Sequence, residues 1–197
     1  MKTNNNMRQI KEKLSIVAIL FSLMNISLAK SPLLLLLAYL IHETGHIFFA
    51  KIMGAEIQKI KGGVFHLSIS YDTKNLSYVK EAVVCSGGIV FNLISALIIL
   101  LLNTSNNDTL STIFVFNLSL ALMNLYPVSI LDGGGILKAL LLSKIQGEVA
   151  EKVNKWISFF FAVILWIVSV YLQIVFSTNV SLPFISIYLL IQLCFSI

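Results

Sequence analysis

Two histidines and a glutamate occur together in the segment His42-Glu43-Thr44-Gly45-His46. On a helix, residues four positions apart lie on one face, so the two imidazoles can reach one zinc ion and Glu43 can reach a water bound to that ion. Zinc lowers the pKa of such a water to about 7. Glutamate can then take the proton and pass it to a leaving amine. The spacing therefore predicts a hydrolytic zinc site.

Asp132 is the best available third ligand, because catalytic zinc normally has three protein ligands and Asp132 is the only other acid close to an apolar segment. It lies in a run from Asn124 to Gly135 that contains Pro127, which disrupts a helix, and three glycines, which let the backbone turn sharply. Irregular backbone at membrane depth is tolerated only where it lines protein or a wet cavity. The carboxylate therefore suggests a site independently of the histidines.

The composition places these residues in a membrane protein. Of the 197 residues, 57% are hydrophobic and 12% are charged. Soluble domains carry about a quarter charged residues and disordered chains are poor in apolar ones, so both classes are excluded. The net charge of +5 comes from lysines scattered between apolar runs, which is typical of topology signals rather than of nucleic-acid binding. Cys85 and Cys194 fit no zinc-knuckle or redox spacing.

Six apolar segments are candidates for transmembrane helices, which need roughly 20 residues each. They are residues 14–29, 32–53, 82–102, 110–131, 156–176 and 182–197. Between the second and third, residues 56–70 carry β-branched side chains around a glycine pair, which predicts a short hairpin. The expected fold is an all-α polytopic membrane protein of about six transmembrane helices with a small β-hairpin between the second and the third.

The basic residues predict the orientation, because lysine and arginine accumulate in cytoplasmic loops. With a cytoplasmic N-terminus, every one of the 14 basic residues except Lys30 lies inside. Both termini are then cytoplasmic, and a prokaryotic cytoplasmic membrane is the expected location. In an alternative reading, the first segment and Ser27-Leu28-Ala29 form a cleavable signal peptide. Either way, the second span runs from outside to inside.

Ionisable side chains inside a span are expensive and indicate function. Four stand out, namely His42, Glu43, His46 and Asp132. A polar contact between helices would explain one histidine or one aspartate, but it does not readily explain four such groups with ligand spacing.

The chain resembles the site-2 protease family of intramembrane zinc metalloproteases. Residues 42–46 match the family's H-E-x-G-H, and residues 124–134 match its N-x-x-P and L-D-G pattern near the end of a later span. Residues 88–92 resemble the glycine-x-x-x-asparagine of the span between them, with Ile89 where the family usually has proline. The resemblance covers roughly residues 32–142. It implies one zinc ion per chain with His42, His46 and Asp132 as ligands and Glu43 as general base.

The resemblance also suggests that Asn124 and Asn92 bind the substrate backbone near the metal. The alternative for both is an interhelical amide hydrogen bond. Tyr126 is expected to serve core packing, with a position near the site as the alternative, and His66 is either a polar residue of the hairpin or borders the cleft. Residues 1–197 are expected to form a single membrane-embedded protease domain with its catalytic core at about 32–142 and flanking spans at 14–29, 156–176 and 182–197.

The depth of the site predicts the substrate class. His42 lies some ten residues into its span, which is about 15 Å from the outer end at ~1.5 Å per residue. The predicted function is an intramembrane zinc endopeptidase that cleaves in or near a transmembrane segment of a membrane-bound regulatory or precursor protein. The expected partners are this substrate, the lipid bilayer and a regulatory membrane protein, with no nucleic acid. Control by a partner, by prior trimming of the substrate or by expression is expected, because the chain lacks room for a PDZ or nucleotide-sensing domain.

Two other functions are compatible with parts of this pattern. A membrane metal-ion transporter or channel also places histidines and acids in its spans, but it does not need a glutamate between two ligands, and no paired repeat halves are visible. An inactive scaffold is disfavoured because every required side chain is present.

Overall fold

The structure, a computed structural model, describes residues 32–63, 66–72, 76–102, 107–176 and 181–195. The predicted first span at 14–29 and Lys30 lie outside these residues. The described elements are, in chain order, α2 (Pro32–Met53), β1 (Glu56–Gly63), β2 (His66–Asp72), α3 (Tyr78–Leu102), α4 (Asp108–Leu125), α5 (Asp132–Leu142), α6 (Gly147–Phe176) and α7 (Ser181–Phe195).

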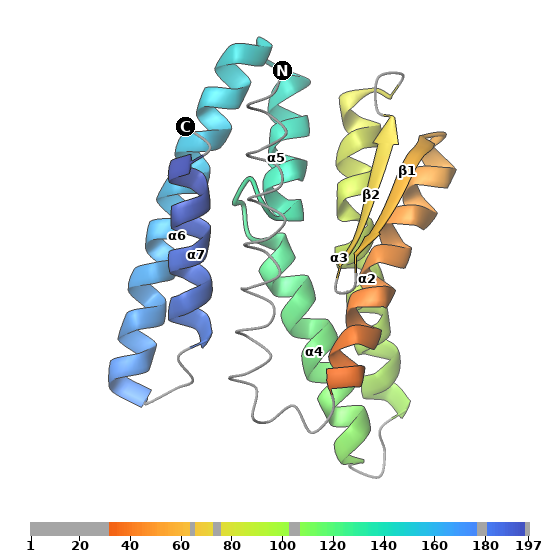
Figure 1. Cartoon of the computed structure of the whole chain (residues 1–197), viewed down its shortest axis with the longest axis vertical. Helices are drawn as coiled ribbons and strands as arrows, with labels where there is room; N and C mark the ends of the chain where they lie inside the picture. Colours follow the sequence, from red (N-terminus) through yellow and green to blue (C-terminus); the bar gives the residue numbers. More distant parts are fainter. Residues whose placement is uncertain (1–31, 64–65, 73–75, 103–106, 177–180, 196–197) are drawn as a thin grey trace.

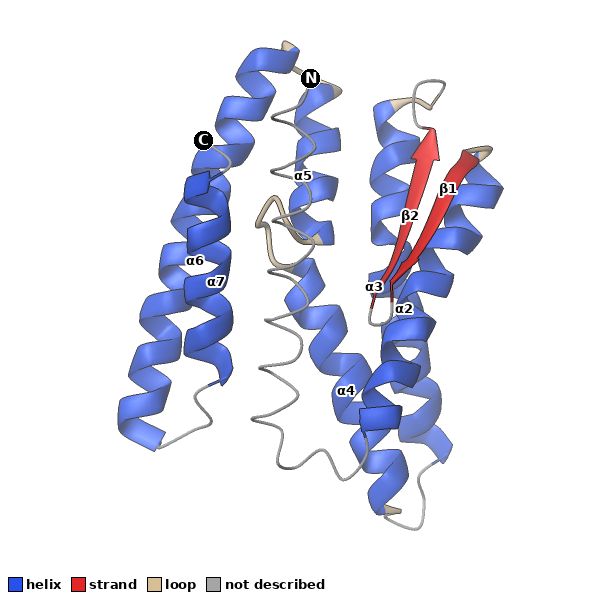
Figure 2. Cartoon of the chain, viewed as in Figure 1, coloured by secondary structure: helices blue, strands red, loops and turns tan. Residues whose placement is uncertain are grey.

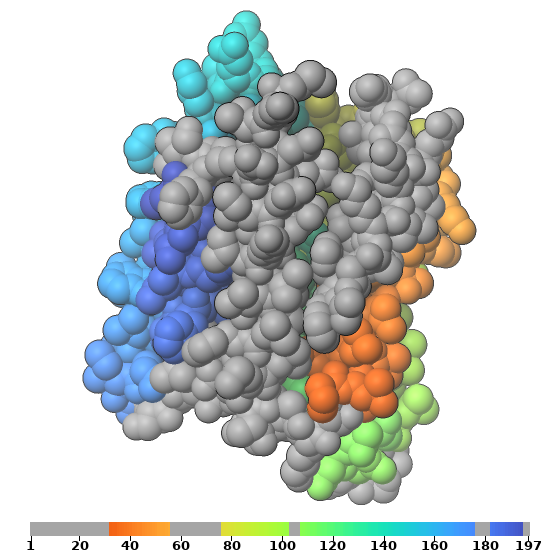
Figure 3. Space-filling model, viewed as in Figure 1, coloured from red at the N-terminus to blue at the C-terminus, as the bar shows by residue number. Residues whose placement is uncertain are grey.

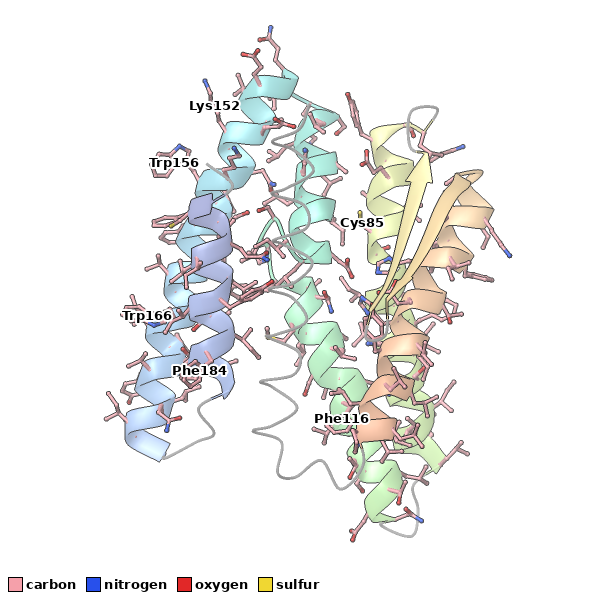
Figure 4. The ribbon with its side chains drawn as sticks, viewed as in Figure 1. Cys85, Phe116, Lys152, Trp156, Trp166 and Phe184 are labelled. Carbon is pink, nitrogen blue, oxygen red and sulfur yellow. The ribbon has the colours of Figure 1, made fainter. Side chains whose placement is uncertain are left out.

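Within the described part of the chain, four helices are long and apolar enough to cross a membrane: α2, α3, α4 and residues Gly147–Val175 of α6. The predicted last span is a shorter apolar helix, α7. Large apolar side chains stand on the outside of the spans, as Trp156 at 74% exposure and Ile174 at 76% illustrate on α6. Figure 4 shows Trp156 and Trp166 pointing away from the other helices. Such a surface suits lipid, which makes the chain a polytopic membrane protein.

α2 begins and ends at residues that favour helix boundaries. Pro32 occupies the first helical position, where its missing N–H costs nothing. At the other end, Gly54 has a φ of +81°. Its N–H donates to Lys51 O at 3.2 Å and the Ala55 N–H donates to Ala50 O at 2.9 Å, the two bonds of a glycine-terminated helix. This turn directs the chain into β1.

β1 and β2, red in Figure 2, pair in antiparallel fashion, and both strands contact α2. The register runs from Glu56 opposite Asp72 to Gly63 opposite His66, with an irregularity between Ile57 and Lys59.

α4 is shorter than the predicted span at 110–131, because it ends at Leu125. Pro127 follows two residues later and cannot continue a helix. The chain then crosses residues 126–131 without helical structure before α5 begins at Asp132. The predicted break before Asp132 is therefore present, and the continuous span to 131 is wrong. α6 begins at Gly147 rather than at the predicted 156.

α3 packs against α2, α4 and α5, while α5 also packs against α6, which pairs with α7. Figure 1 shows α2 and α3 on one side of the molecule, α6 and α7 on the other and α5 between them. In the space-filling view α2 (orange) and the α6–α7 pair (blue) again lie on opposite sides (Figure 3). α5 thus connects the two groups of helices.

Small polar side chains hold the α6–α7 pair. Ser169 and Ser186, both fully buried, place their Oγ atoms 3.1 Å apart. A small apolar cluster of Val128, Ala162, Leu189 and Leu193 joins this pair to the 126–131 segment. Small residues and hydroxyl groups are the usual means of helix association in lipid, where apolar packing alone provides little drive.

Lysines gather at one end of the bundle. α2 ends, α3 begins, α5 ends and α6 begins at the same end (Figure 1), and Lys152 projects there from α6 (Figure 4). Two contacts join these segments: Lys80 Nζ donates to Met53 O at 3.4 Å, and Lys138 Nζ lies 2.9 Å from Glu151 Oε1. That this end faces the cytoplasm stays a prediction from the distribution of the basic residues.

Candidate metal centre

His42 and His46 of α2 meet Asp132 of α5 inside the bundle. His42 Nε2 lies 3.0 Å from Asp132 Oδ2, and His46 Nε2 lies 3.2 Å from the same oxygen. The two Nε2 atoms are 3.2 Å apart. The two imidazole side chains are 6% and 11% exposed and the carboxylate is 22% exposed. Three possible ligands from two helices, far apart in sequence, thus converge on one small region.

The three atoms fit a tetrahedral zinc ion. Ligands at about 2.0–2.1 Å from such an ion lie roughly 3.3 Å from one another. The observed separations of 3.0, 3.2 and 3.2 Å are close to this value. Nitrogen and carboxylate oxygen are also the donors that zinc accepts. His42, His46 and Asp132 therefore suit zinc in both geometry and chemistry and leave a fourth position for water or substrate.

A backbone carbonyl orients His46. The His46 Nδ1 atom lies 2.9 Å from Val84 O, which can only accept, so Nδ1 carries the proton and donates it. Nε2 is then unprotonated and available to a metal. Val84 is buried on α3, and its carbonyl is therefore a fixed acceptor for His46.

Glycines allow α2 to approach α3 this closely. A β-carbon on Gly45 would overlap the Gly87 carbonyl, and one on Gly87 would be 2.5 Å from the Gly45 oxygen. One turn away, the His42 ring lies against Gly88, where a β-carbon would be 2.6 Å from Nδ1. Any larger residue at these positions would push the two helices apart. The close contact therefore places both histidines beside α3.

Asp132 is held by the segment before it. The Tyr126 hydroxyl donates to Phe161 O at 2.9 Å, and the Ser129 N–H donates to Ser158 Oγ at 2.9 Å, so α6 anchors residues 126–129. Gly133 and Gly134 then pass so close to the backbone of residues 125–129 that a β-carbon on either would overlap it. The first turn of α5 is thereby fixed against the end of α4, and Asp132 begins that turn.

Further along α5, Gly135 faces Cys85 of α3. A β-carbon on Gly135 would be 3.1 Å from the Cys85 Sγ atom. Figure 4 shows Cys85 on the side of α3 that faces α5. The two helices that orient His46 and carry Asp132 therefore contact each other directly.

Glu43 is half-buried on α2 next to His42. A hydrogen bond with Tyr39 holds its carboxylate, which interacts electrostatically with His46, His42 and Asp132. The predicted general base is thus in the same charged cluster as the three possible ligands.

The predicted substrate-binding asparagines have different surroundings. Asn124 is half-buried near the end of α4, and its Nδ2 donates to Leu120 O at 3.0 Å. Asn92 of α3 is 0% exposed, and neither its Oδ1 nor its Nδ2 has a hydrogen-bond partner among the described residues. Tyr126 packs against Phe161 with ring centroids 5.6 Å apart, in line with its predicted packing role. His66 begins β2, and its side chain lies outside the described part.

Sequence reasoning missed Val84, and it noted Gly88 only as the first residue of the glycine-x-x-x-asparagine pattern, without its contact with His42. Val84 acts through its backbone, which no side-chain pattern can indicate. The adjacent Gly87-Gly88 pair did carry a signal, because small residues in a membrane helix mark a close contact with another helix.

Comparison with protein families gives one match, to Peptidase family M50, over residues 102–168. This third of the chain includes Asn124 and Asp132 but not the two histidines. No curated protein matches the chain by sequence.

The fold is similar to that of the Site-2 Protease from Methanocaldococcus jannaschii, with a TM-score of 0.62 and 24% sequence identity. The similarity covers 91% of this chain and 86% of the archaeal one, so it includes both groups of helices. At this identity the likeness concerns the fold. The family match and the shared fold support a membrane metalloprotease, and together they confirm the resemblance of this chain to the site-2 protease family.

Proposed function

We propose that this chain is an intramembrane zinc endopeptidase whose single domain extends over residues 1–197. The observation that carries the proposal is the meeting of His42, His46 and Asp132 with ligand-atom separations of 3.0–3.2 Å on apolar helices. The M50 match over the segment with Asp132 supports the same activity.

His42 and His46 bind one zinc ion through Nε2, and Asp132 binds it through its carboxylate. The bound ion supplies a Lewis acid that polarises the scissile carbonyl and lowers the pKa of the attacking water. The protein fixes the positions of these ligands beforehand, through Val84 O at His46 and through the anchored 126–131 segment at Asp132. Such preorganisation avoids reorganisation during the reaction.

Glu43 is the general base. Its carboxylate accepts a proton from the attacking water and delivers it to the amine that leaves. The hydrogen bond with Tyr39 restricts the carboxylate. Glu43 is not needed as a ligand, because three other side chains fill that role.

The substrate is a transmembrane segment of a membrane-bound regulatory or precursor protein. His42 lies in the middle of α2, so a bond cleaved there is inside or near the bilayer. A helix protects its peptide bonds by internal hydrogen bonding, so the substrate must unwind locally. Pairing of the extended substrate with the β1–β2 hairpin, by strand addition, compensates for the lost helical bonds, and Asn124 holds its backbone near the metal.

The test uses the purified chain reconstituted in liposomes with a panel of single-span substrates. We expect cleavage that a chelator abolishes and zinc restores, and we expect Glu43→Gln to retain zinc but lose cleavage. Asn124→Ala should reduce cleavage with zinc content unchanged, whereas loss of zinc would make Asn124 a structural residue. A chain that cleaves no substrate and instead carries zinc across the liposome membrane would replace the proposal with a transporter.

A further inference from the structure

The two histidines of the metal centre differ in how their second ring nitrogen is held. His46 Nδ1 donates to Val84 O, but His42 Nδ1 is buried without a hydrogen-bond partner among the described residues. A metal-ligating imidazole almost always donates its other N–H, because this bond sets the tautomer and the ring orientation. His42 therefore needs an acceptor to match Val84.

The side-chain amide of Asn92 also lacks hydrogen-bond partners among the described residues, and its oxygen is an acceptor of the kind that His42 needs. Its side chain is fully buried on α3, and both polar atoms of its amide are without partners among the described residues. An unpaired amide in an apolar interior is destabilising, because it has lost its hydrogen bonds to water. Lipid around the bundle supplies no hydrogen bonds, so this cost persists unless a polar group inside the protein meets the amide. A buried asparagine in this condition is expected to serve an interaction.

The geometry of α3 places the two unpaired groups, His42 Nδ1 and the Asn92 amide, on the same side of the helix. The His42 ring lies on Gly88, and Nδ1 is one of the three ring atoms nearest to that position. Asn92 follows Gly88 by four residues on α3, so both positions share one face of the helix. Side chains on a helix lean towards its N-terminus, so that of Asn92 leans over the turn that contains Gly88. Because Gly88 has no side chain, it leaves room above the backbone where the imidazole lies.

We propose that Asn92 is a positioning residue that orients His42 through one buried water molecule. The water accepts a hydrogen bond from the Nδ1–H group of His42 and donates one to Asn92 Oδ1. A water is the fitting link, because no direct hydrogen bond joins the two side chains and a bridging water is nearly as favourable as a direct bond. The centre then has one fixed acceptor per histidine, Val84 O for His46 and Asn92 for His42. This assignment rests on the proposed zinc site and replaces the predicted contact of Asn92 with substrate.

The variant that tests this proposal is Asn92→Leu. Its zinc affinity is measured in competition with a chelator, and the absorption spectrum is recorded for the Co²⁺-loaded protein. Leucine fills the volume but provides no acceptor. We expect zinc affinity to fall 10–100-fold, the size seen for other outer-shell partners, and the cobalt bands to shift. The melting temperature of the metal-free protein should stay equal or rise, because replacement of an unpaired buried amide by an apolar group is nearly neutral or stabilising. If Asn92 were purely structural, Asn92→Leu would keep the zinc affinity and cobalt bands of the wild type, and the melting temperature of its metal-free form would fall.

Asn154→Leu is the matched control. Asn154 is also buried, at 3% exposure, and its Oδ1 also has no partner among the described residues, but it belongs to α6. We expect its zinc affinity and cobalt spectrum to match the wild type. If Asn92→Leu does not fold, Asn92→Ser and Asn92→Ala decide, because only serine retains an oxygen acceptor. Serine should then bind zinc at least tenfold more tightly than alanine.

Unchanged zinc affinity and cobalt bands in Asn92→Leu, or equal affinities of the serine and alanine variants, would overturn the assignment of Asn92 while leaving the zinc site intact. A wild-type chain that binds no zinc would overturn the proposed function and this assignment together.

Discussion

The imidazole ring of His42 lies directly against the backbone of Gly88, where a β-carbon would be 2.5–2.6 Å from three ring atoms. Position 88 therefore accepts only hydrogen as a side chain while His42 keeps its place beside Asp132. The contact links the packing of α2 on α3 to the geometry of the metal centre.

Gly88→Ala should displace the His42 ring and weaken zinc binding about 10–100-fold, the range for loss of a group that orients a ligand. Chelator competition measures the affinity. Gly147→Ala is the control, because its β-carbon would meet only the Leu142 side chain at 3.8 Å. Equal zinc affinity in Gly88→Ala and the wild type would show that the ring does not depend on this contact.

Gly87→Ala should destabilise the fold rather than the metal site alone. Its β-carbon would be 2.5 Å from Gly45 O and 3.0 Å from His46 N, both backbone atoms that cannot rotate away. Overpacking of this kind costs about 1–3 kcal/mol. Thermal unfolding of the metal-free protein in detergent should show a lower midpoint than Gly147→Ala, and an unchanged midpoint would mean that α2 and α3 can separate without cost.

Ser158→Ala should loosen the segment that carries Asp132. Ser158 is fully buried, and its Oγ accepts the Ser129 N–H at 2.9 Å, so alanine leaves that N–H without its acceptor. The expected loss of stability is about 1–3 kcal/mol. Ser143→Ala is the control, since the exposed Ser143 hydroxyl bonds only Leu140 O in its own helix. Similar melting temperatures for the two variants would rule out this anchoring role.

Removal of zinc should lower the stability of the whole bundle, because an ion held by His42, His46 and Asp132 would join α2 to α5. A ligand that binds only the folded state at 100 times its Kd stabilises it by about 2.7 kcal/mol. Chelation should therefore lower the melting temperature, and added Zn²⁺ should restore it. Mg²⁺, which prefers oxygen ligands in an octahedral arrangement, should not restore it. If the melting temperature is the same with and without the chelator, no ion bridges the two helices.

The sequence predicts the side chains of the metal centre better than the contacts between helices that hold these side chains in place. Helical spacing places His42 and His46 on one face, and Pro127 with the glycines indicates the break before Asp132, so local rules suffice for these features. The end of α4 at Leu125 is less predictable, because the residues after it remain apolar up to Leu131. Hydropathy alone therefore extends that span too far.

The contacts between helices could not be predicted from such local sequence patterns. Two contacts depend on how closely and in which register α2 packs against α3. They are the hydrogen bond of His46 to the Val84 carbonyl and the contact of the His42 ring with Gly88. No residue pattern within a single helix encodes that register. The unpartnered amide of Asn92 likewise emerges only when its burial and surroundings are known.

The most direct test of the zinc centre is the zinc content of the purified chain and of its single variants. We predict one zinc per chain in the wild type and in Glu43→Gln, and none after dialysis in His42→Ala, His46→Ala or Asp132→Ala. Zinc retained at full stoichiometry by Asp132→Ala, or a wild-type chain without zinc, would contradict the account.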